Sequence, residues 1–250
     1  MKKGHISYII QEIGGMSLLL PQIILQIFKP PFKSKYLINQ LVQIGVNTLP
    51  IVSIMALFVG MVLAYLAYLQ FKLVGLEVYT GSLVSACMVM ELGPVLTAII
   101  VAGRIGASTT AEIGSMKVTE QIDALSTLAV NPIKYLATPR FLAAIIMLPL
   151  LTIFADVIGI FGGYMVGVWQ FGIRHRIYMD KALDFLSSDD IICGLIKTMF
   201  FGAMIVVVSC YKGFTTVGGA EGVGKATTSA VVISIVLILV MDYFLTIVLF

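Results

Sequence analysis

The sequence ends in the stretch Thr228–Phe250, TSAVVISIVLILVMDYFLTIVLF, in which Asp242 is the one charged residue. A helix of about 20 predominantly apolar residues crosses the roughly 30 Å hydrocarbon core of a bilayer. The stretch is therefore predicted to be a transmembrane helix. Four earlier blocks share its character, at residues 48–71, 83–107, 140–170 and 191–211. We predict an all-α polytopic membrane protein with five membrane helices.

The composition agrees with this class. Of the 250 residues, 59% are hydrophobic and 12% are charged, whereas about a quarter of the residues of a soluble domain are charged. Cys87, Cys193 and Cys210 are scattered in or beside apolar segments, and His5 and His175 are isolated. We expect buried thiols, with no disulfide and no metal site.

The N-terminal segment differs from the five blocks. In residues 4–30, apolar side chains recur near helical spacing with polar ones between them, and Pro21 and the pair Pro30-Pro31 interrupt the pattern. A helix of this kind lies in the membrane interface. We assign residues 1–40 to an interfacial helix and residues 41–250 to the membrane domain; a sixth span is the alternative.

Basic residues predict the orientation, because cytoplasmic loops carry an excess of Lys and Arg. With the N-terminus inside, most of the 16 basic residues fall on the cytoplasmic side: Lys2, Lys3, Lys29, Lys33, Lys35, Arg104, Lys117, Lys134, Arg140, Lys212 and Lys225. The predicted topology is N-in and C-out.

Four charged residues interrupt the apolar blocks: Glu91, Asp156, Lys197 and Asp242. A charge at the centre of a membrane helix costs roughly 2.5–3.5 kcal/mol on insertion scales, so each is either functional or part of a buried pair that locks helices together. Lys197 and Asp242 lie near the outer ends of their helices, and we expect their side chains to extend to water. For Asp156 we expect a structural role.

Glu91 is followed directly by Gly93 and Pro94. A proline removes a backbone donor and tends to kink a helix, which frees a carbonyl group that needs another partner. A carboxylate at such a break suits a polar spot in an outward-opening cavity. A purely structural contact is the alternative.

Glycines recur at every fourth position in the third block, at Gly159, Gly163 and Gly167. Such ridges let helix backbones approach closely in lipid. We predict a packing role, either within one chain or between two copies.

The stretch GGAEGVGKAT, residues 218–227, approaches the phosphate-binding pattern G-x-x-x-x-G-K-[ST]. A phosphate loop follows a β-strand and opens a helix, and its Ser or Thr binds magnesium. Here Ala226 stands at the Ser or Thr position, and membrane helices are predicted on both sides. We predict a flexible inner loop that binds no nucleotide.

The inner segment at about 108–135 has the pattern of an amphipathic cytoplasmic helix. Thr109 and Glu112 have the spacing of a capping box, and Asn131-Pro132 is expected to end the helix. An apolar stripe runs along the segment at Ile113, Met116, Ile122 and Leu125. The segment either docks a soluble motor protein or lies on the bilayer surface.

The block ELGPVLTAIIVAGRIGASTTAEIGSMKVTEQIDAL, residues 91–125, resembles the signature of the MlaE/YrbE permeases, the membrane subunits of ABC systems that move phospholipids across the envelope of double-membraned bacteria. The resemblance continues through NPIKYLATPRFLAAIIMLPLLT at 131–152, GVGKATTSAVV at 222–232 and MDYFLT at 241–246. This chain departs from several relatives at Met90, where they carry a basic residue.

The resemblance implies a homodimer with an outward-open phospholipid cavity between the copies. It also implies a separate cytoplasmic ATPase, which binds ATP and Mg, and an MCE-type substrate-binding protein on the outer face; this chain is then no enzyme and has no cofactor. A small cytoplasmic regulatory subunit is a further candidate partner, and no nucleic acid is expected. The implied location is the inner membrane of a double-membraned bacterium, rather than the plastid inner envelope.

The resemblance also implies roles for individual residues. Candidate residues of the lipid path are Glu91, Pro94 and Arg104. Candidate residues of the ATPase-docking surface are Glu112, Lys117, Glu120, Gln121 and Asp123.

Two other functional classes compete with this one. The first is a proton-coupled secondary transporter that uses Glu91 and Asp156. Such transporters often contain inverted repeats, but no internal repeat is visible here and five spans do not divide into equal halves. The second is an intramembrane enzyme, for which Ser, His and Cys show no paired constellation.

Overall fold

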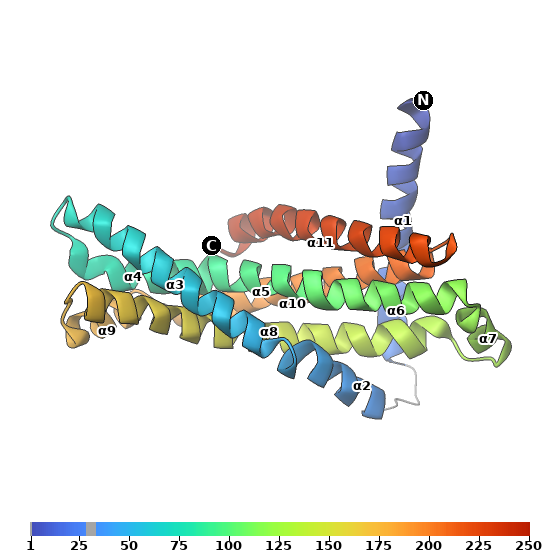
Figure 1. Ribbon diagram of the computed structural model, residues 1–250, viewed down its shortest axis with the longest axis horizontal. Coiled ribbons are helices and arrows are strands. Elements are labelled where there is room, and N and C mark those ends of the chain that lie inside the picture. The colour runs from blue at the N-terminus through green and yellow to red at the C-terminus, as the bar shows by residue number, and fades with distance from the viewer. Residues whose placement is uncertain (1, 29–33) are drawn as a thin grey trace. The chain divides into compact units, whose positions relative to one another are not determined.

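The computed structural model describes residues 2–28 and 34–250, and α-helices make up most of them (Figure 1). No residue in these two ranges lies in a β-strand. Pro30-Pro31, Lys29 and Lys33, on which part of the N-terminal interpretation and of the charge count rests, lie outside the described residues. The helices are α1 (Lys2–Ile27), α2 (Ser34–Leu41), α3 (Leu49–Lys72), α4 (Thr80–Cys87), α5 (Gly93–Val101), α6 (Ala107–Val118), α7 (Gln121–Thr127), α8 (Thr138–Tyr164), α9 (His175–Asp184), α10 (Ser188–Phe214) and α11 (Gly219–Leu249).

Short π-helical segments adjoin several of these helices, and two of them join α4 to α5 and α5 to α6 without a loop. They lie at Val42–Val46, Met88–Leu92, Ala102–Gly106, Ile133–Ala137 and Met165–Gln170. π-helical turns are rare and occur frequently at functional sites. The segment at Met88–Leu92 contains Glu91, so the predicted helix break at this residue is a π-helical turn.

The predicted number of membrane helices is confirmed. In the described chain, five stretches are long and apolar enough to cross a membrane: Lys35–Lys72, Glu77–Val118, Ile133–Gln170, Ser188–Phe214 and Gly219–Leu249. Each is longer than its predicted block because the helix continues into polar sequence. Helix α1 is not among the five, and its interfacial position stays a prediction.

The chain packs as two compact units, which are described separately. Unit 1 consists of residues up to Ile44, Val101–Ile145 and Gly202–Leu237. Unit 2 consists of Gly45–Ile100, Ile146–Phe201 and Ile238–Phe250.

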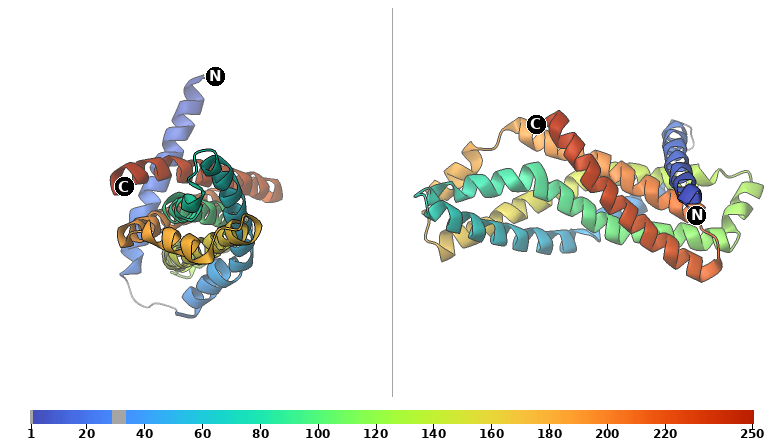
Figure 2. Two further views of the ribbon diagram at one scale, coloured as in Figure 1. Left: turned by 90° about the vertical axis from the view of Figure 1, so that its left-hand side faces the viewer. Right: turned by 90° about the horizontal axis from the view of Figure 1, so that it is seen from above.

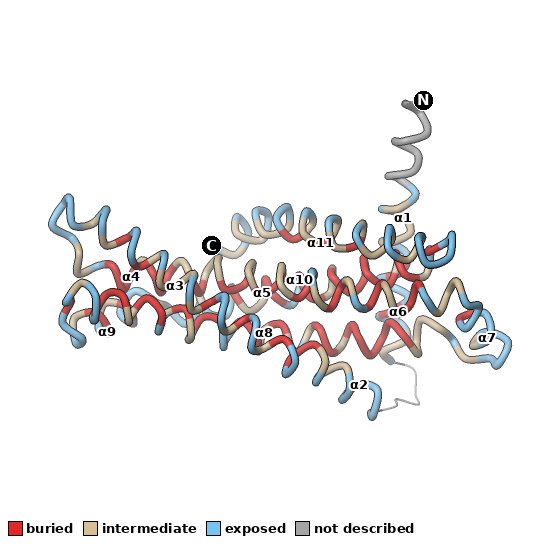
Figure 3. Tube along the Cα trace, in the orientation of Figure 1, coloured by how far each residue is buried: buried red, intermediate tan, exposed pale blue. Residues whose placement is uncertain are grey.

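In unit 2, helix α4 packs against both α3 and α9 (Figures 1 and 2). It is buried over most of its length, although it is rich in Ser and Thr (Figure 3). Its serine hydroxyl groups have backbone acceptors: Ser82 donates to the Lys181 carbonyl oxygen of α9 at 2.8 Å, and Ser85 donates to the Ser82 carbonyl oxygen at 3.0 Å. Small residues whose hydroxyl groups are hydrogen-bonded to backbone oxygens therefore let three helices approach closely.

The glycine ridge of α8 and of the π-helical segment that follows it also lies in the interior of unit 2. A Cβ atom on Gly159 would lie 2.2 Å from Met88 Cε, and one on Gly163 would lie 2.7 Å from Val84 Cγ1. One on Gly167 would lie 2.6 Å from the ring of Tyr178, a fully buried residue whose pKa is raised by burial. These contacts are all made within one chain.

In unit 1, the end of α10 packs against α6. A Cβ atom on Gly213 would lie 2.7 Å from Ile113 Cβ, and the Thr110 hydroxyl donates to the Ser209 carbonyl oxygen at 3.1 Å. Helix α1 joins this unit through an ion pair between Glu12 and Lys212 and through Gly15, which lies against the ring of Tyr211.

Three predictions about connecting segments are wrong. Helix α11 begins at Gly219, so most of GGAEGVGKAT is helical rather than a flexible loop. Thr109 and Glu112 form no capping box because the helix already extends through the preceding residues. Asn131-Pro132 begins a helix rather than ending one: the Asn131 carboxamide oxygen accepts from the Ile133 amide at 2.9 Å.

Candidate functional site

The site in unit 2 forms where the second span is broken. Pro94 has no N–H group, so it cannot donate to the carbonyl oxygen of Met90, four residues earlier. The ammonium group of Lys197 on α10 donates to that carbonyl oxygen at 3.1 Å. The prediction that Pro94 leaves a carbonyl group in need of another partner is therefore confirmed.

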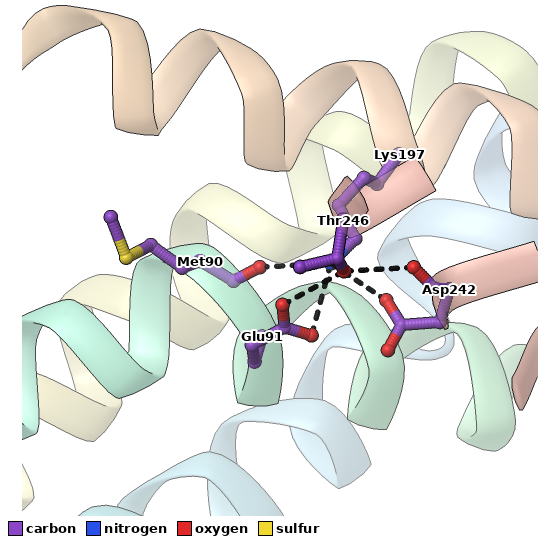
Figure 4. Close-up of polar contacts among 5 residues, drawn as sticks. All are labelled: Met90, Glu91, Lys197, Asp242 and Thr246. Atoms are coloured by element: carbon purple, nitrogen blue, oxygen red, sulfur yellow. Dashed lines mark hydrogen bonds and ion pairs between the residues drawn. The ribbon is translucent and has the colours of Figure 1, made fainter. Parts of the chain in front are cut away.

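The same ammonium group holds two carboxylates and a hydroxyl (Figure 4). Lys197 Nζ lies 3.0 Å from Glu91 Oε2, 2.7 Å from Asp242 Oδ1 and 2.9 Å from Thr246 Oγ1. Thr246 Oγ1 in turn lies 3.0 Å from Glu91 Oε1, to which it donates. We call Met90, Glu91, Lys197, Asp242 and Thr246 the Lys197 network.

The Lys197 network is buried unevenly. The Lys197 side chain is fully buried, whereas the side chains of Asp242 and Glu91 keep 18% and 38% of their surface exposed. An ammonium group has three N–H donors, and four acceptor oxygens surround this one. Lys197 is therefore saturated, and Glu91 is the most exposed of the three charged members.

The expectation that Lys197 and Asp242 extend to water is wrong. Both side chains turn inward because each offers the other an opposite charge inside the unit, and a charge in the membrane is better paired than exposed to hydrocarbon. With all three groups ionised, the network carries one net negative charge.

A glycine on α10 brings Lys197 to the network. A Cβ atom on Gly194 would lie 2.5 Å from the Val89 carbonyl oxygen, so only glycine lets α10 approach the π-helical turn this closely. Gly194 and Lys197 are three residues apart and share a helix face. The sequence reasoning missed both Gly194 and Thr246, although the spacing of Asp242 and Thr246, four residues apart, places them on one face of α11.

Asp156 lies apart from these contacts. Its side chain is nearly buried, with 9% exposed, and Oδ1 has no hydrogen-bond partner among the described residues. A Cβ atom on Gly93 would lie 1.8 Å from this oxygen. The absence of a side chain at Gly93 therefore makes room for the Asp156 carboxyl group beside the π-helical turn.

Arg104 lies in the π-helical segment Ala102–Gly106 of unit 1, whereas Glu91 and Pro94 belong to unit 2. Its assignment to a common lipid path with them stays a prediction.

The predicted docking residues all lie in unit 1. Glu112 is engaged by Arg140, whose Nη2 lies 2.7 Å from Glu112 Oε2 and whose side chain is almost fully buried. Glu112 is itself partly exposed, and Glu120, Gln121 and Asp123 are exposed at or just after the break between α6 and α7.

The break itself is a strained turn. Glu120 has a φ of 61°, in the left-handed region that non-glycine residues rarely adopt. Lys117 bridges the turn, because its Nζ lies 3.1 and 3.2 Å from the two carboxylate oxygens of Asp123. Residues held in this backbone region cluster at functional sites.

Comparison with known proteins identifies the family. The family described as Permease MlaE matches residues 37–248. A probable ABC transporter permease protein of Rickettsia prowazekii is 45% identical over 236 residues, which cover 94% of this chain and 91% of the relative.

Two further relatives are less similar in sequence. The intermembrane phospholipid transport system permease protein MlaE of Haemophilus influenzae is 37% identical over 225 residues, covering 89% of this chain and 86% of the relative. The chloroplastic protein TRIGALACTOSYLDIACYLGLYCEROL 1 of Arabidopsis thaliana is 38% identical over 232 residues, which cover 93% of this chain and 66% of the relative. With five apolar helices and a match over most of its length, this multi-pass membrane protein belongs to the MlaE permease family.

Proposed function

We propose that the chain is the permease subunit of an ABC transporter that moves phospholipids between the inner and outer membranes of a double-membraned bacterium. The observation that carries this proposal is the family match over residues 37–248, together with the phospholipid-transport name of the Haemophilus influenzae relative. The chain lies in the inner membrane in this proposal, with the N-terminus in the cytoplasm and residues 1–40 including an interfacial helix.

Two copies form the transport path, and a phospholipid cavity that opens outward lies between them. Glu91 borders this cavity beside the helix break at Pro94. Because Lys197 is saturated within the chain, it stabilises the broken span and takes no direct part in binding lipid phosphate. The polar group offered to the lipid is the partly exposed carboxylate of Glu91.

ATP hydrolysis takes place in a separate cytoplasmic ATPase, which binds ATP and Mg. The ATPase docks on the strained turn that carries Glu120, Gln121 and Asp123, because these side chains are exposed. The ion pair between Glu112 and Arg140 then transmits movement of α6 to the start of α8. An MCE-domain protein on the outer face receives or delivers the lipid, and a small cytoplasmic regulatory subunit completes the assembly.

Mass spectrometry of the material that co-purifies with the tagged chain from its native membrane tests this proposal. We expect a stoichiometric ATPase, an MCE-domain protein and phospholipid. A chain that purifies with phospholipid but without any ATPase contradicts the proposal. That result favours the proton-coupled alternative, in which Glu91 and Asp156 carry the proton.

A further inference from the structure

A second candidate site lies in unit 1, outside the Lys197 network. An open groove of about 730 Å³ lies between α1, the α6–α7 turn, residues 129–133 and the end of α10. Small-molecule sites typically measure about 300–1,000 Å³ and are lined by apolar side chains with a few polar groups. The size and construction of the groove fit that class.

The lining has the character of an amphiphile site. Most of the side chains are apolar, among them Leu18, Ile122, Ile133 and Phe214. Lys117 is the only charged residue among those that line the groove, and no carboxylate is among them. An apolar groove with one cation matches a ligand that has an acyl chain and an anionic head.

The cation is available to a ligand at little cost. Lys117 is paired with Asp123, but the two side chains are 34% and 60% exposed. Exposed ion pairs contribute little to stability, so a phosphate group can replace or share this carboxylate. The hydroxyl groups of Ser126 and Thr215, which also line the groove, are already bonded to their own helices.

We propose that this groove binds an anionic phospholipid of the surrounding bilayer, with one acyl chain along the groove and the phosphate beside Lys117. The chain is a multi-pass membrane protein, so bilayer lipid is always present. In the proposed topology the groove lies on the cytoplasmic side, where the leaflet carries anionic lipids that attract basic residues. The lipid is separate from transported lipid, and it joins α1 to the turn that we propose as the ATPase-docking surface.

Photo-crosslinking of the purified chain in phosphatidylcholine nanodiscs tests this site. Two phospholipid probes carry the same photoreactive acyl chain, one with a phosphatidylglycerol and one with a phosphatidylcholine head. We expect the phosphatidylglycerol probe to label peptides that contain Leu18, Ile122 and Ile133 about fivefold more than the other, which corresponds to about 1 kcal/mol for one basic residue.

Two substitutions that remove charges of opposite sign sharpen the test. Lys117→Gln should reduce labelling by the anionic probe to that of the zwitterionic probe, and Asp123→Asn should increase it. The matched controls are Lys225→Gln and Glu221→Gln, because this exposed pair on α11 is outside the groove. Both controls should leave labelling unchanged.

Three results with the chain alone would overturn the proposal. These are equal labelling by the two probes, labelling that is confined to other peptides, and labelling that is insensitive to Lys117→Gln. Loss of labelling when the ATPase is added would also overturn it, because the groove would then belong to a protein partner. The experiment requires neither ATP nor transport, so its failure is distinguishable from failure of the proposed transport function.

Discussion

Removal of the Lys197 ammonium group by Lys197→Met should destabilise the protein by about 3 kcal/mol. Breaking a buried ion pair costs about 3–5 kcal/mol, because the remaining charge stays buried without a partner. Asp242 is 18% exposed and bears most of this cost, whereas Glu91 is 38% exposed and is partly screened by its surroundings. The expected loss of stability is therefore at the lower end of this range, about 3 kcal/mol.

Thermal unfolding in mild detergent measures this effect. One kcal/mol shifts Tm by about 2–4 °C in a protein of this size, so Lys197→Met should lower Tm by about 6–12 °C. Lys225→Met is the matched control, because Lys225 and its partner Glu221 are 77% and 79% exposed. An exposed pair contributes about 0–1 kcal/mol, so the control should shift Tm by at most about 4 °C.

A double variant tests the physical reason. Replacing both members of a buried ion pair by neutral groups is often neutral or stabilising. Lys197→Met combined with Asp242→Asn should therefore be more stable than Lys197→Met alone. The reasoning is refuted if Lys197→Met shifts Tm no more than Lys225→Met does, or if the two substitutions at the network destabilise additively.

Three further predictions concern packing, docking and transport. Gly60→Ala should prevent correct packing, because the added Cβ atom would lie 1.9 Å from the Gly159 carbonyl oxygen. Gly103→Ala is the control and should be tolerated, because no atom lies within 4 Å of the position of its Cβ atom. Gel filtration of both variants measures the effect on packing, and equal elution profiles would contradict the prediction. Glu120→Lys should reduce co-purification of the ATPase severalfold by reversing charge on an exposed turn, and undiminished co-purification would remove Glu120 from the docking surface. Glu91→Ala should impair lipid transport while leaving assembly intact, because Asp242 still pairs with Lys197; wild-type transport would leave Glu91 a structural role alone.

The membrane helices were predictable from the sequence because their signal is local. Length and hydropathy identify each of the five spans. The extent of a helix was not predictable in the same way, because backbone hydrogen bonds continue where apolar side chains stop. The second span illustrates this: its helical stretch runs to Val118, well past the predicted end at residue 107. Helix α11 likewise begins at Gly219, inside a glycine-rich stretch that predicted a loop.

The candidate site was predictable only in part. The positions of Glu91, Lys197 and Asp242 within apolar segments indicated that these charges are costly in the membrane. The position of Pro94 indicated a backbone carbonyl group that lacks its usual helical partner. Their meeting depends on packing between spans, because Lys197 lies 106 residues from Glu91 in the chain. No local pattern reports such a contact, so an inward ion pair was mistaken for two side chains that extend to water.

ATP-dependent transfer of phospholipid tests the central claim most directly. The chain and its co-purified partners are reconstituted in proteoliposomes that contain labelled phospholipid, and release of label to an acceptor is measured with ATP, without ATP and with a proton gradient alone. We expect transfer that requires both ATP and the ATPase, and that is reduced by Glu91→Ala. Transfer that is driven by the proton gradient without ATP would contradict the account.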